Sequence, residues 1–386
     1  MIFVLLLFLC GAARAATIPA EFTEHLIAAD LKGGYQVVVA DLNKDGKPDI
    51  IALASGMQEL VWYENPAWIR HVLAVDLAHM INLAAWDTDG DGIPKIVLAH
   101  EFANDARKSI GIISVLQHGP DPLQPWKVTE IDRIPTSHRL RWADIYGNGK
   151  KVLVNAPLTG LKAEPPEYRG KTPLVIYKPG AWMRETIPQQ NEGVQHGIYI
   201  TDWDGDGREA ILTASFLGIH LFKMGSDGAW SRTEISKGDP APWPKSGSSD
   251  VTVGWLGKKP RTRFVAAIEP WHGNQVAVYQ EDKKHIWQRQ VIDDSLDQAH
   301  TILTADLNGD GNDEIIAGHR GKGHGVNIYY ANNAKGEHWS SHPLDAGIAA
   351  SSCAVADLNA DGLPDIVCIG SATANLKWYE NKGPKK

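Results

Sequence analysis

A short pattern of apolar strand, Asp-rich turn and second apolar strand recurs along this chain. Its clearest copies run over residues 37–52 and 354–367, and weaker copies have turns at Asp87, Asp144, Asp202, near Trp255 and at Asp306. Seven copies spaced by roughly 45–60 residues are typical of propeller blades and similar arrays. The even repeat therefore predicts one closed domain over residues 16–386, where length alone would suggest two or three.

Each copy contains the material for four short strands. The third strand often ends in an aromatic pair, as in Trp62-Tyr63, and the fourth often begins with Trp, as in Trp68. The last copy has no room for a fourth strand, whereas residues 22–30 match the fourth-strand pattern of residues 68–76. We therefore expect an all-β, seven-bladed β-propeller whose N-terminal strand closes the last blade.

The first residues indicate export. Residues 1–10 are apolar and lead to Ala13-x-Ala15, so residues 1–15 are expected to be a cleaved signal peptide and the protein to be secreted or periplasmic, although a leading Lys or Arg is missing. A membrane anchor is the alternative, but the run is short for a span. Lipidation of Cys10 is a further alternative that Phe8-Leu9 disfavours. No other stretch is expected to enter a membrane, and no basic stripe points to nucleic acid.

Two cysteines, Cys353 and Cys368, flank the last Asp-rich turn symmetrically. They should face each other on paired strands, where an exported protein can form a disulfide. Two small buried thiols are the simpler alternative, and we expect the thiols.

The turns follow the pattern D-x-N/D-x-D-G-x-x-D. Oxygen ligands at positions 1, 3, 5 and 9, with a Gly that permits positive φ at position 6, suit Ca²⁺ in a structural role. An Asx-type turn without metal is the alternative. The last two of the following five sets lack an acid at position 9 and should bind more weakly. The candidate ligands are Asp41, Asn43, Asp45 and Asp49; Asp357, Asn359, Asp361 and Asp365; Asp306, Asn308, Asp310 and Glu314; Asp87, Asp89 and Asp91; and Asp202, Asp204 and Asp206.

The opposite face of the disc should carry the starts of the first strands and the loops after the second strands. Eight of the 15 histidines fall there. Neutral imidazoles suit a transition metal such as Zn²⁺ and acid–base chemistry near neutral pH, so a functional pocket is expected. An insertion over residues 157–173 is a candidate lid. The candidate substrate-binding residues are His79, His100, Glu101, Asn155, Arg169, Asp250, Glu269, His272, Asn274, His319, Arg320 and His324, and the candidate catalytic residues are His138, Arg139, His196, Tyr168 and His300.

Two resemblances add to this interpretation. The turns resemble FG-GAP (VCBS-type) repeats. The chain resembles the propeller region of aldos-2-ulose dehydratases at residues 137–144, 154–157, 195–197, 269–274 and 319–321. Several sugar lyases are also built on a propeller. The resemblance implies β-elimination on a keto-sugar or a uronate-containing glycan. For this reaction we assign His138 or His196 as base, Arg139 or a His-bound metal as electrophile, and Tyr168 or His300 as acid.

A non-catalytic propeller that binds glycan or protein is the alternative function. Such a rim should be rich in exposed Trp and Tyr. This rim is rich in His, Arg and Glu, which favours a carbon–oxygen lyase.

Overall fold

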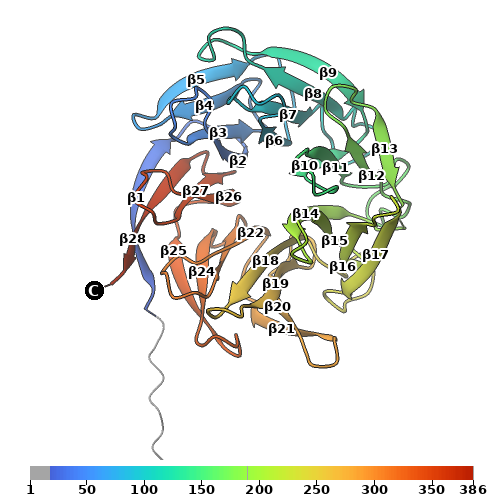
Figure 1. Cartoon of the computed structure of the whole chain (residues 1–386), viewed down its shortest axis with the longest axis vertical. Coiled ribbons are helices and arrows are strands. Elements are labelled where there is room, and N and C mark those ends of the chain that lie inside the picture. Colours follow the sequence, from blue (N-terminus) through green and yellow to red (C-terminus); the bar gives the residue numbers. More distant parts are fainter. Residues whose placement is uncertain (1–17, 189, 386) are drawn as a thin grey trace, which may run out of the picture.

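The computed structural model describes residues 18–188 and 190–385, so the expected signal peptide and Cys10 lie outside the described residues. The described residues form 28 β-strands and no helix. These strands make seven four-stranded sheets that are arranged like blades around a central axis (Figure 1), and six of the sheets pair strands that are consecutive in the chain. The predicted all-β, seven-bladed propeller is therefore confirmed. No helix in the described ranges is long and apolar enough to cross a membrane.

The blades follow chain order. Their strands are β2 (Gly34–Ala40), β3 (Asp49–Ala54), β4 (Leu60–Glu64) and β5 (Ile69–Ala74) in blade one; β6 (Asn82–Trp86), β7 (Lys95–His100), β8 (Ile112–Gln117) and β9 (Lys127–Arg133) in blade two; β10 (Ser137–Ala143), β11 (Val152–Pro157), β12 (Leu174–Tyr177) and β13 (Arg184–Ile187) in blade three; β14 (Gln195–Asp202), β15 (Glu209–Ser215), β16 (Gly218–Met224) and β17 (Trp230–Ser236) in blade four; β18 (Asp250–Leu256), β19 (Thr262–Glu269), β20 (Gln275–Glu281) and β21 (Trp287–Asp293) in blade five; β22 (Ala299–Ala305), β23 (Glu314–His319), β24 (Gly325–Ala331) and β25 (Trp339–Asp345) in blade six; and β26 (Ala350–Ala356), β27 (Asp365–Gly370), β28 (Leu376–Pro384) and β1 (Ala20–Ala28) in blade seven.

The N-terminal strand closes the ring as the sequence predicts. Strand β1 pairs antiparallel with β28, for example Phe22 with Asn381 and His25 with Trp378. Figure 1 shows β1 and β28 side by side in this blade. Pairing the first strand with the last leaves no open sheet edge between the first and last blades.

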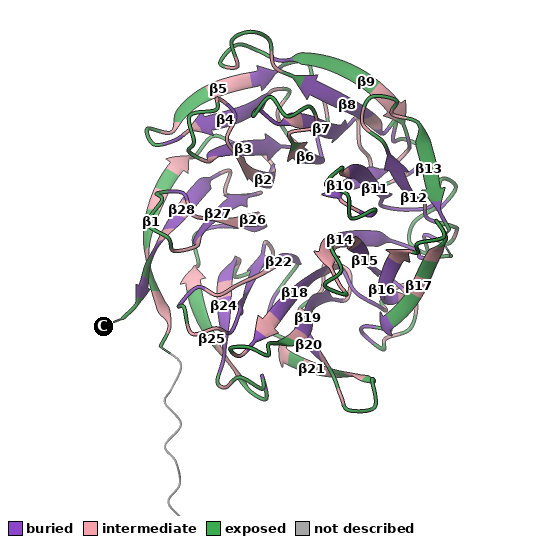
Figure 2. Cartoon of the chain, viewed as in Figure 1, coloured by how far each residue is buried: buried purple, intermediate pink, exposed green. Residues whose placement is uncertain are grey.

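Burial is greatest in the second strands of the blades and least in the outermost strands. Every residue of β3, β11, β23 and β27 is buried, whereas most residues of the outermost strands are exposed or half-buried (Figure 2). Apolar side chains of neighbouring blades pack in shared clusters; one joins Ile51 and Trp62 of blade one to Leu83 and Leu98 of blade two. The core is therefore a ring of contacts between blades, and it fixes the innermost strands around the axis.

Polar side chains also join the innermost strands of neighbouring blades. The Gln36 side chain donates to the Leu83 carbonyl at 3.0 Å and accepts from the Leu83 N–H at 2.6 Å. Asn82 Oδ1 accepts from the Leu140 N–H at 2.8 Å. These bonds between blades fix the relative height of the strands that carry the rim residues.

The Asp-rich turns are closed by hydrogen bonds of their own. Asp41 accepts from the N–H groups of Lys44 at 2.7 Å and Gly46 at 2.9 Å, as in an Asx turn. At position 9, both oxygens of Asp49 accept backbone N–H groups, from Leu42 at 2.9 Å and Asn65 at 3.0 Å. Asp365 does the same in blade seven. The position-9 side chains therefore clamp the backbone of the turn onto the third strand.

The acidic groups of the turns differ in how closely they gather. Among the described residues, Asp87, Asp89 and Asp91 form the acidic turn group whose ligand oxygens all lie within 4.8 Å of one another. This turn lacks an acid at position 9, and Lys95 there places its ammonium against Asp89. A turn that was expected to bind weakly thus brings three carboxylates together, although a lysine supplies a cation. Calcium binding stays a prediction.

The turn of blade six has an unusual acid. Glu314 is fully buried, and its Oε2 accepts from the Leu307 N–H at 2.7 Å. Its Oε1 has no hydrogen-bond partner among the described residues. Burial, the largest cause, raises the pKa of Glu314 to about 9, so the carboxyl is protonated at neutral pH.

Cys353 and Cys368 are paired residues of β26 and β27, and they form a disulfide. The expectation of two free thiols was wrong. Directly opposite residues of an antiparallel pair have Cβ atoms close enough for a bridge, so the strand register itself brings the two sulfurs together.

Candidate functional site

Three rim histidines stand at the same place in three blades. His138, His196 and His300 are the second residues of β10, β14 and β22. The pairing of each strand shifts at this residue, which marks a β-bulge. A bulge leaves one residue out of the ladder and re-aims its side chain. The local irregularity therefore turns all three imidazoles toward the central channel, on the face away from the Asp-rich turns.

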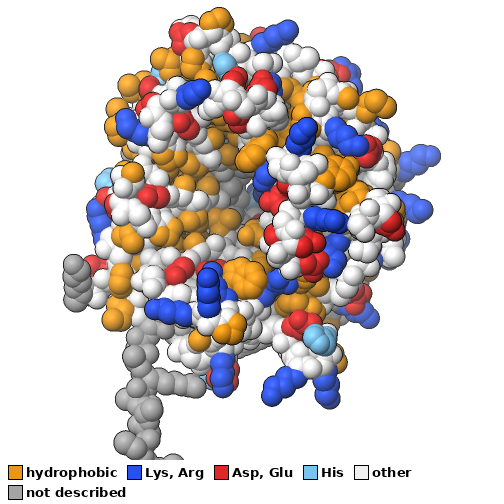
Figure 3. Space-filling view, in the orientation of Figure 1, with side chains coloured by type: hydrophobic (Ala, Val, Ile, Leu, Met, Phe, Trp, Pro, Cys, Tyr) orange, Lys and Arg blue, Asp and Glu red, His pale blue; other side chains and the backbone are white. Residues whose placement is uncertain are grey.

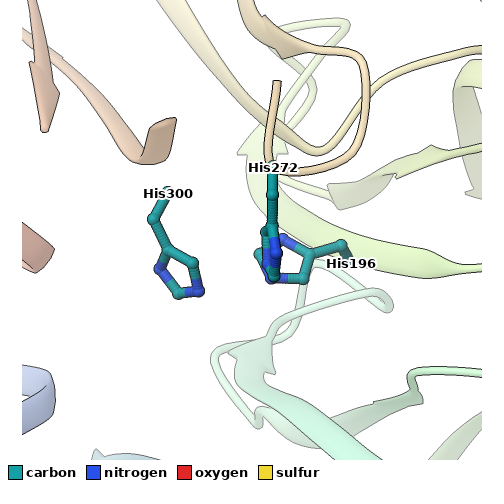
Figure 4. A group of neighbouring side chains, drawn as sticks. All are labelled: His196, His272 and His300. Atoms are coloured by element: carbon teal, nitrogen blue, oxygen red, sulfur yellow. The ribbon is translucent and has the colours of Figure 1, made fainter. Parts of the chain in front are cut away.

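A fourth imidazole joins them from a loop. His272 lies between β19 and β20, with a left-handed φ of 48°. The ring centroid of His196 lies 4.8 Å from those of His138 and His272, and 4.9 Å from that of His300. Figure 4 shows His196, His272 and His300 gathered around one point of the channel. The four rings form one cluster, called here the imidazole cluster, drawn from blades three to six.

Backbone carbonyls determine which ring nitrogen carries the hydrogen in two of these histidines. His196 Nδ1 lies 3.1 Å from the Ser249 carbonyl oxygen, and His300 Nδ1 lies 2.6 Å from that of Ser351. A carbonyl only accepts, so the ring N–H is on Nδ1 and the Nε2 lone pair faces the channel. This arrangement is typical of metal-ligating histidines, whose second ring nitrogen donates to the backbone.

The spacing of the ligand nitrogens of His196, His272 and His300 is compatible with a bound transition metal. The ligand nitrogens of His196, His272 and His300 all lie within 4.8 Å of one another, and the Nε2 atoms of His196 and His272 are 3.2 Å apart. Two imidazole nitrogens bound to one tetrahedral zinc are about 3.3 Å apart, given bonds of about 2.0–2.1 Å. His300 Nε2 is buried and has no partner among the described residues. The donor set therefore suits a metal that prefers nitrogen ligands.

Tyr35 and Arg139 complete the centre of the cluster. The Tyr35 hydroxyl lies 2.9 Å from His138 Nε2. The two terminal nitrogens of Arg139 lie 3.4 Å from Nε2 of His138 and of His196. Because arginine only donates, both Nε2 atoms act as acceptors. Arg139 is 5% exposed, and no carboxylate of the described residues is within ion-pair distance of it. This buried cation therefore lacks an acidic partner of its own.

Burial keeps the imidazoles neutral. Loss of hydration, followed by the charge of Arg139, holds the pKa values of His138 and His196 well below their usual range. Loss of hydration, followed by the charge of Arg320, does the same for His300, and lowers the pKa of His272 to about 3. Neutral rings bind metals and accept protons, so the cluster is in the required form at pH 7.

The cluster lies between two cavities of the channel. The upper one, about 250 Å³, opens on the rim. The lower one, about 150 Å³, contains Arg139, Arg141 and Asp250, and burial raises the pKa of Asp250 to about 6 against the opposing effect of the two arginines. Figure 3 shows the molecule hollowed at its centre. Arg139 and Arg141 face a single carboxylate here, which favours an anionic ligand or a developing negative charge.

Eight of the predicted site residues meet in these cavities. The structure places in the upper cavity His79, His138, His196, His272 and Arg320, and in the lower one Arg139, Asp250 and His300. These come from blades two to six.

Nine predicted residues do not line either cavity: Tyr168, Arg169, His100, Glu101, Asn155, Glu269, Asn274, His319 and His324.

The insertion of blade three explains two of these nine. Tyr168 is buried behind Trp271, with ring centroids 5.8 Å apart, and Arg169 lies over the Trp243 ring at 4.7 Å. Leu158 is the one residue of this insertion that lines the upper cavity. The insertion therefore packs against the shoulder of the channel and does not cover its mouth.

Others of the nine have structural partners. Glu269 is fully buried and accepts from Ser248 Oγ at 2.9 Å, from the Tyr279 hydroxyl and from Arg289 Nε at 2.9 Å. Asn155 is buried and donates to Ser137, His100 lies 3.0 Å from Ser114 Oγ, and Asn274 donates to the Asp294 carbonyl.

On the rim, Glu101 lies 3.8 Å from His79, while His319 is buried and His324 is half-buried.

Several residues of the site were not predicted. Tyr35, Phe102, Asn104 and Trp271 line the upper cavity, and Arg141 lines the lower one. For Tyr35 the signal is in the repeat, because it stands six residues before Asp41, as His138 stands six before Asp144. Phe102 and Asn104 lie in a loop with no repeated pattern, so nothing in the sequence marks them.

The fold and site define the class of the protein: a seven-bladed propeller with FG-GAP-like turns and an imidazole-lined channel. The sequence profile of the FG-GAP-like repeat matches residues 306–368, and that of the aldos-2-ulose dehydratase β-propeller domain matches residues 111–282. The second range includes His138, Arg139, His196 and His272.

The chain is distantly similar to the aldos-2-ulose dehydratase of Phanerodontia chrysosporium, with 22% identity over 354 residues. This match covers 80% of the present chain and 38% of that enzyme, so the chain spans well under half of its length. In structure it is similar to an Agrocybe aegerita lectin that specifically recognises non-reducing terminal N-acetylglucosamine. The TM-score is 0.50, with 14% identity, and the match covers 82% of this chain and 81% of the lectin. That likeness concerns the fold alone.

Proposed function

We propose that this protein is a carbohydrate lyase or dehydratase that performs β-elimination on a keto-sugar or a uronate-containing glycan at the imidazole cluster. The observation that carries the proposal is the contact of neutral imidazoles with one buried arginine and one tyrosine in a single channel. The distant similarity to a sugar dehydratase over the same segment supports it.

The Tyr35–His138 pair supplies the proton transfers. The His138 imidazole removes the proton α to the carbonyl, and the bond between the β-carbon and its oxygen breaks as the double bond forms. The Tyr35 hydroxyl, 2.9 Å from His138 Nε2, protonates the leaving oxygen and then recovers a proton from His138. Water or an alcohol leaves, and both side chains return to their starting state. Tyr35 takes the acid role that the sequence had given to Tyr168 or His300.

Arg139 and Arg320 bind the negative charge. Both lie beside the cluster, and a guanidinium is matched to a carboxylate or an enolate oxygen. His196, His272 and His300 are the residues that would hold a transition metal such as Zn²⁺. When bound, that ion supplies Lewis acidity toward the carbonyl oxygen of the substrate. The protein's own task is to orient the nitrogens of His196 and His300 through the Ser249 and Ser351 carbonyls.

Two further proposals concern the setting of the enzyme. Residues 1–15 are a signal peptide that exports the protein, in agreement with the Cys353–Cys368 disulfide, which persists in oxidising compartments. Ca²⁺ binds the Asp-rich turns and stiffens the face opposite the cluster.

The test is a substrate screen. Purified protein is incubated with keto-sugars, with glycans containing uronate and with neutral glycans, and the ultraviolet absorbance of a conjugated unsaturated product is followed. His138→Ala should lower kcat by roughly 10²–10⁴-fold, as expected for loss of a general base. No absorbing product from any keto-sugar or uronate glycan, with metal supplied, would reject the proposed reaction.

A further inference from the structure

A second concave site lies on the other face of the disc, between blades two and three. Its cavity is about 540 Å³, within the range of small-ligand sites. Two aromatic rings line it and are open to solvent: Trp86, 38% exposed, and Tyr146, 37% exposed. Both belong to the Asp-rich turn side, so this site is separate from the imidazole cluster.

The repeat shows that Trp86 is a departure from the pattern. It stands immediately before the first Asp of its turn. The same position in the other six blades holds only small residues: Ala40, Ala143, Thr201, Gly254, Ala305 and Ala356. A position that folds with alanine in four blades does not need an indole for the fold. The ring at this place in blade two, facing a cavity, therefore calls for another explanation.

Tyr146 departs from the pattern in the same way. It occupies position 3 of the blade-three turn, where five blades carry Asp or Asn: Asn43, Asp89, Asp204, Asn308 and Asn359. The blade-three turn has also lost its acid at position 9, which is Val152. The turn that is degenerate as a calcium pattern thus supplies an exposed aromatic ring. Two independent departures, in adjacent blades, face one cavity.

Lysines surround these rings. The Lys151 ammonium lies 4.5 Å from the Trp86 ring centroid, and that of Lys178 lies 5.7 Å from Tyr146. Glu209 and Glu185 pair with these two lysines. Lys150 also lines the cavity, is exposed, and has no ion pair among the described residues. Asp87 is the one acid in the lining, and its carboxylate accepts hydrogen bonds from backbone N–H groups of its own turn. The cavity therefore combines flat rings with ammonium groups.

We propose that this site binds an acidic saccharide. The apolar face of a sugar ring stacks on Trp86 and Tyr146, and its carboxylate or sulfate pairs with Lys150, which has no ion pair among the described residues. A flat aromatic surface with ammonium groups beside it matches a pyranose that carries an anion, and the strong hydration of lysine suits a solvent-open contact. The proposal stands whether or not the imidazole cluster is catalytic, because it uses none of those residues.

The repeat itself supplies the test variants. Trp86→Ala and Tyr146→Asn restore residues that other blades carry at these positions, so both should fold. The whole protein is titrated by calorimetry with a galacturonate hexasaccharide, a sulfated oligosaccharide and a neutral glucose oligomer. We expect the anionic sugars to bind, and the double variant to weaken their binding at least 10-fold. Lys150→Ala should weaken binding and reduce its dependence on salt.

The control variant is Ile286→Ala, which removes an exposed apolar side chain of blade five and should leave the affinity unchanged. Any binding that Arg139→Ala weakens takes place in the central channel. The proposal is overturned if no anionic sugar binds, if binding survives the double variant, or if the neutral oligomer binds equally well.

Discussion

Removing Arg289 should destabilise the protein because Glu269 depends on it. Glu269 is fully buried, and Arg289, whose side chain is 26% exposed, contacts it at 2.8–2.9 Å. Breaking a buried ion pair by deleting one partner costs about 3–5 kcal/mol, and the partial exposure of Arg289 places this pair at the lower end, near 3 kcal/mol. For 386 residues the unfolding entropy is about 0.8 kcal/mol/K, so Arg289→Met should lower Tm by about 4 °C.

The double variant Glu269→Gln/Arg289→Met carries no buried charge and should recover part of this loss. Unfolding followed by fluorescence in urea and by heat measures all three proteins. Arg133→Met is the control, because its pair with Glu130 is exposed and should contribute little.

The same experiment separates two roles for Glu269. The sequence suggested a substrate contact, whereas the structure gives Ser248, Tyr279 and Arg289 as its partners. A positioning role predicts lower stability and a small change in kcat for Glu269→Gln. An unchanged Tm for Arg289→Met, or a large loss of kcat at unchanged Tm for Glu269→Gln, would refute this reasoning.

Three more predictions follow from the structure. The double variant Cys353→Ala/Cys368→Ala should be about 3 kcal/mol less stable than the oxidised protein, because the disulfide closes a loop with a sequence separation of 15. Under reducing conditions the variant and the unmodified protein should have equal stability. Denaturation with and without reductant checks both expectations. Burial raises the pKa of Asp250 from 3.8 to about 6, so stability should fall as pH rises across that window, and Asp250→Asn should flatten the Tm profile between pH 4 and 6. Chelation of Ca²⁺ should lower Tm, and Asp41→Asn should reduce that effect; identical shifts in both proteins would argue against calcium in the first turn.

The fold could be predicted from the sequence because the same strand–turn–strand pattern occurs in seven copies, one for each blade. One Asp-rich turn sets the pairing of the first two strands, and the match of residues 22–30 to residues 68–76 shows where the ring closes. The disulfide was not predicted, since two cysteines on paired strands suit both a bridge and buried thiols, and the choice depends on side-chain geometry.

The site was predicted in part, and the errors have a common cause. Counting back from the turn Asp found His138, His196 and His300, because one β-bulge recurs at that place. Counting cannot tell on which side of a strand or loop a residue lies. Glu269 and His272 are three residues apart, yet Glu269 is buried within its blade and His272 faces the channel.

Long loops were the hardest to predict. The insertion of blade three was a candidate lid for the channel, and its Tyr168 was a candidate catalytic residue. Its apolar residues Leu158, Ala163 and Tyr168 instead lie in a cluster against which Trp271 and Trp243 pack, while most of its other residues are exposed. Its composition alone does not distinguish a lid from a packed shoulder.

The most direct measurement compares His196→Ala with His100→Ala on one active substrate. Both histidines are buried with lowered pKa values, but only His196 faces the channel, while His100 lies beside Ser114. We predict loss of kcat/KM by at least about 10²-fold for His196→Ala at a nearly unchanged Tm, and near-normal turnover for His100→Ala. Equal activity of the two variants would contradict a catalytic role for the imidazole cluster.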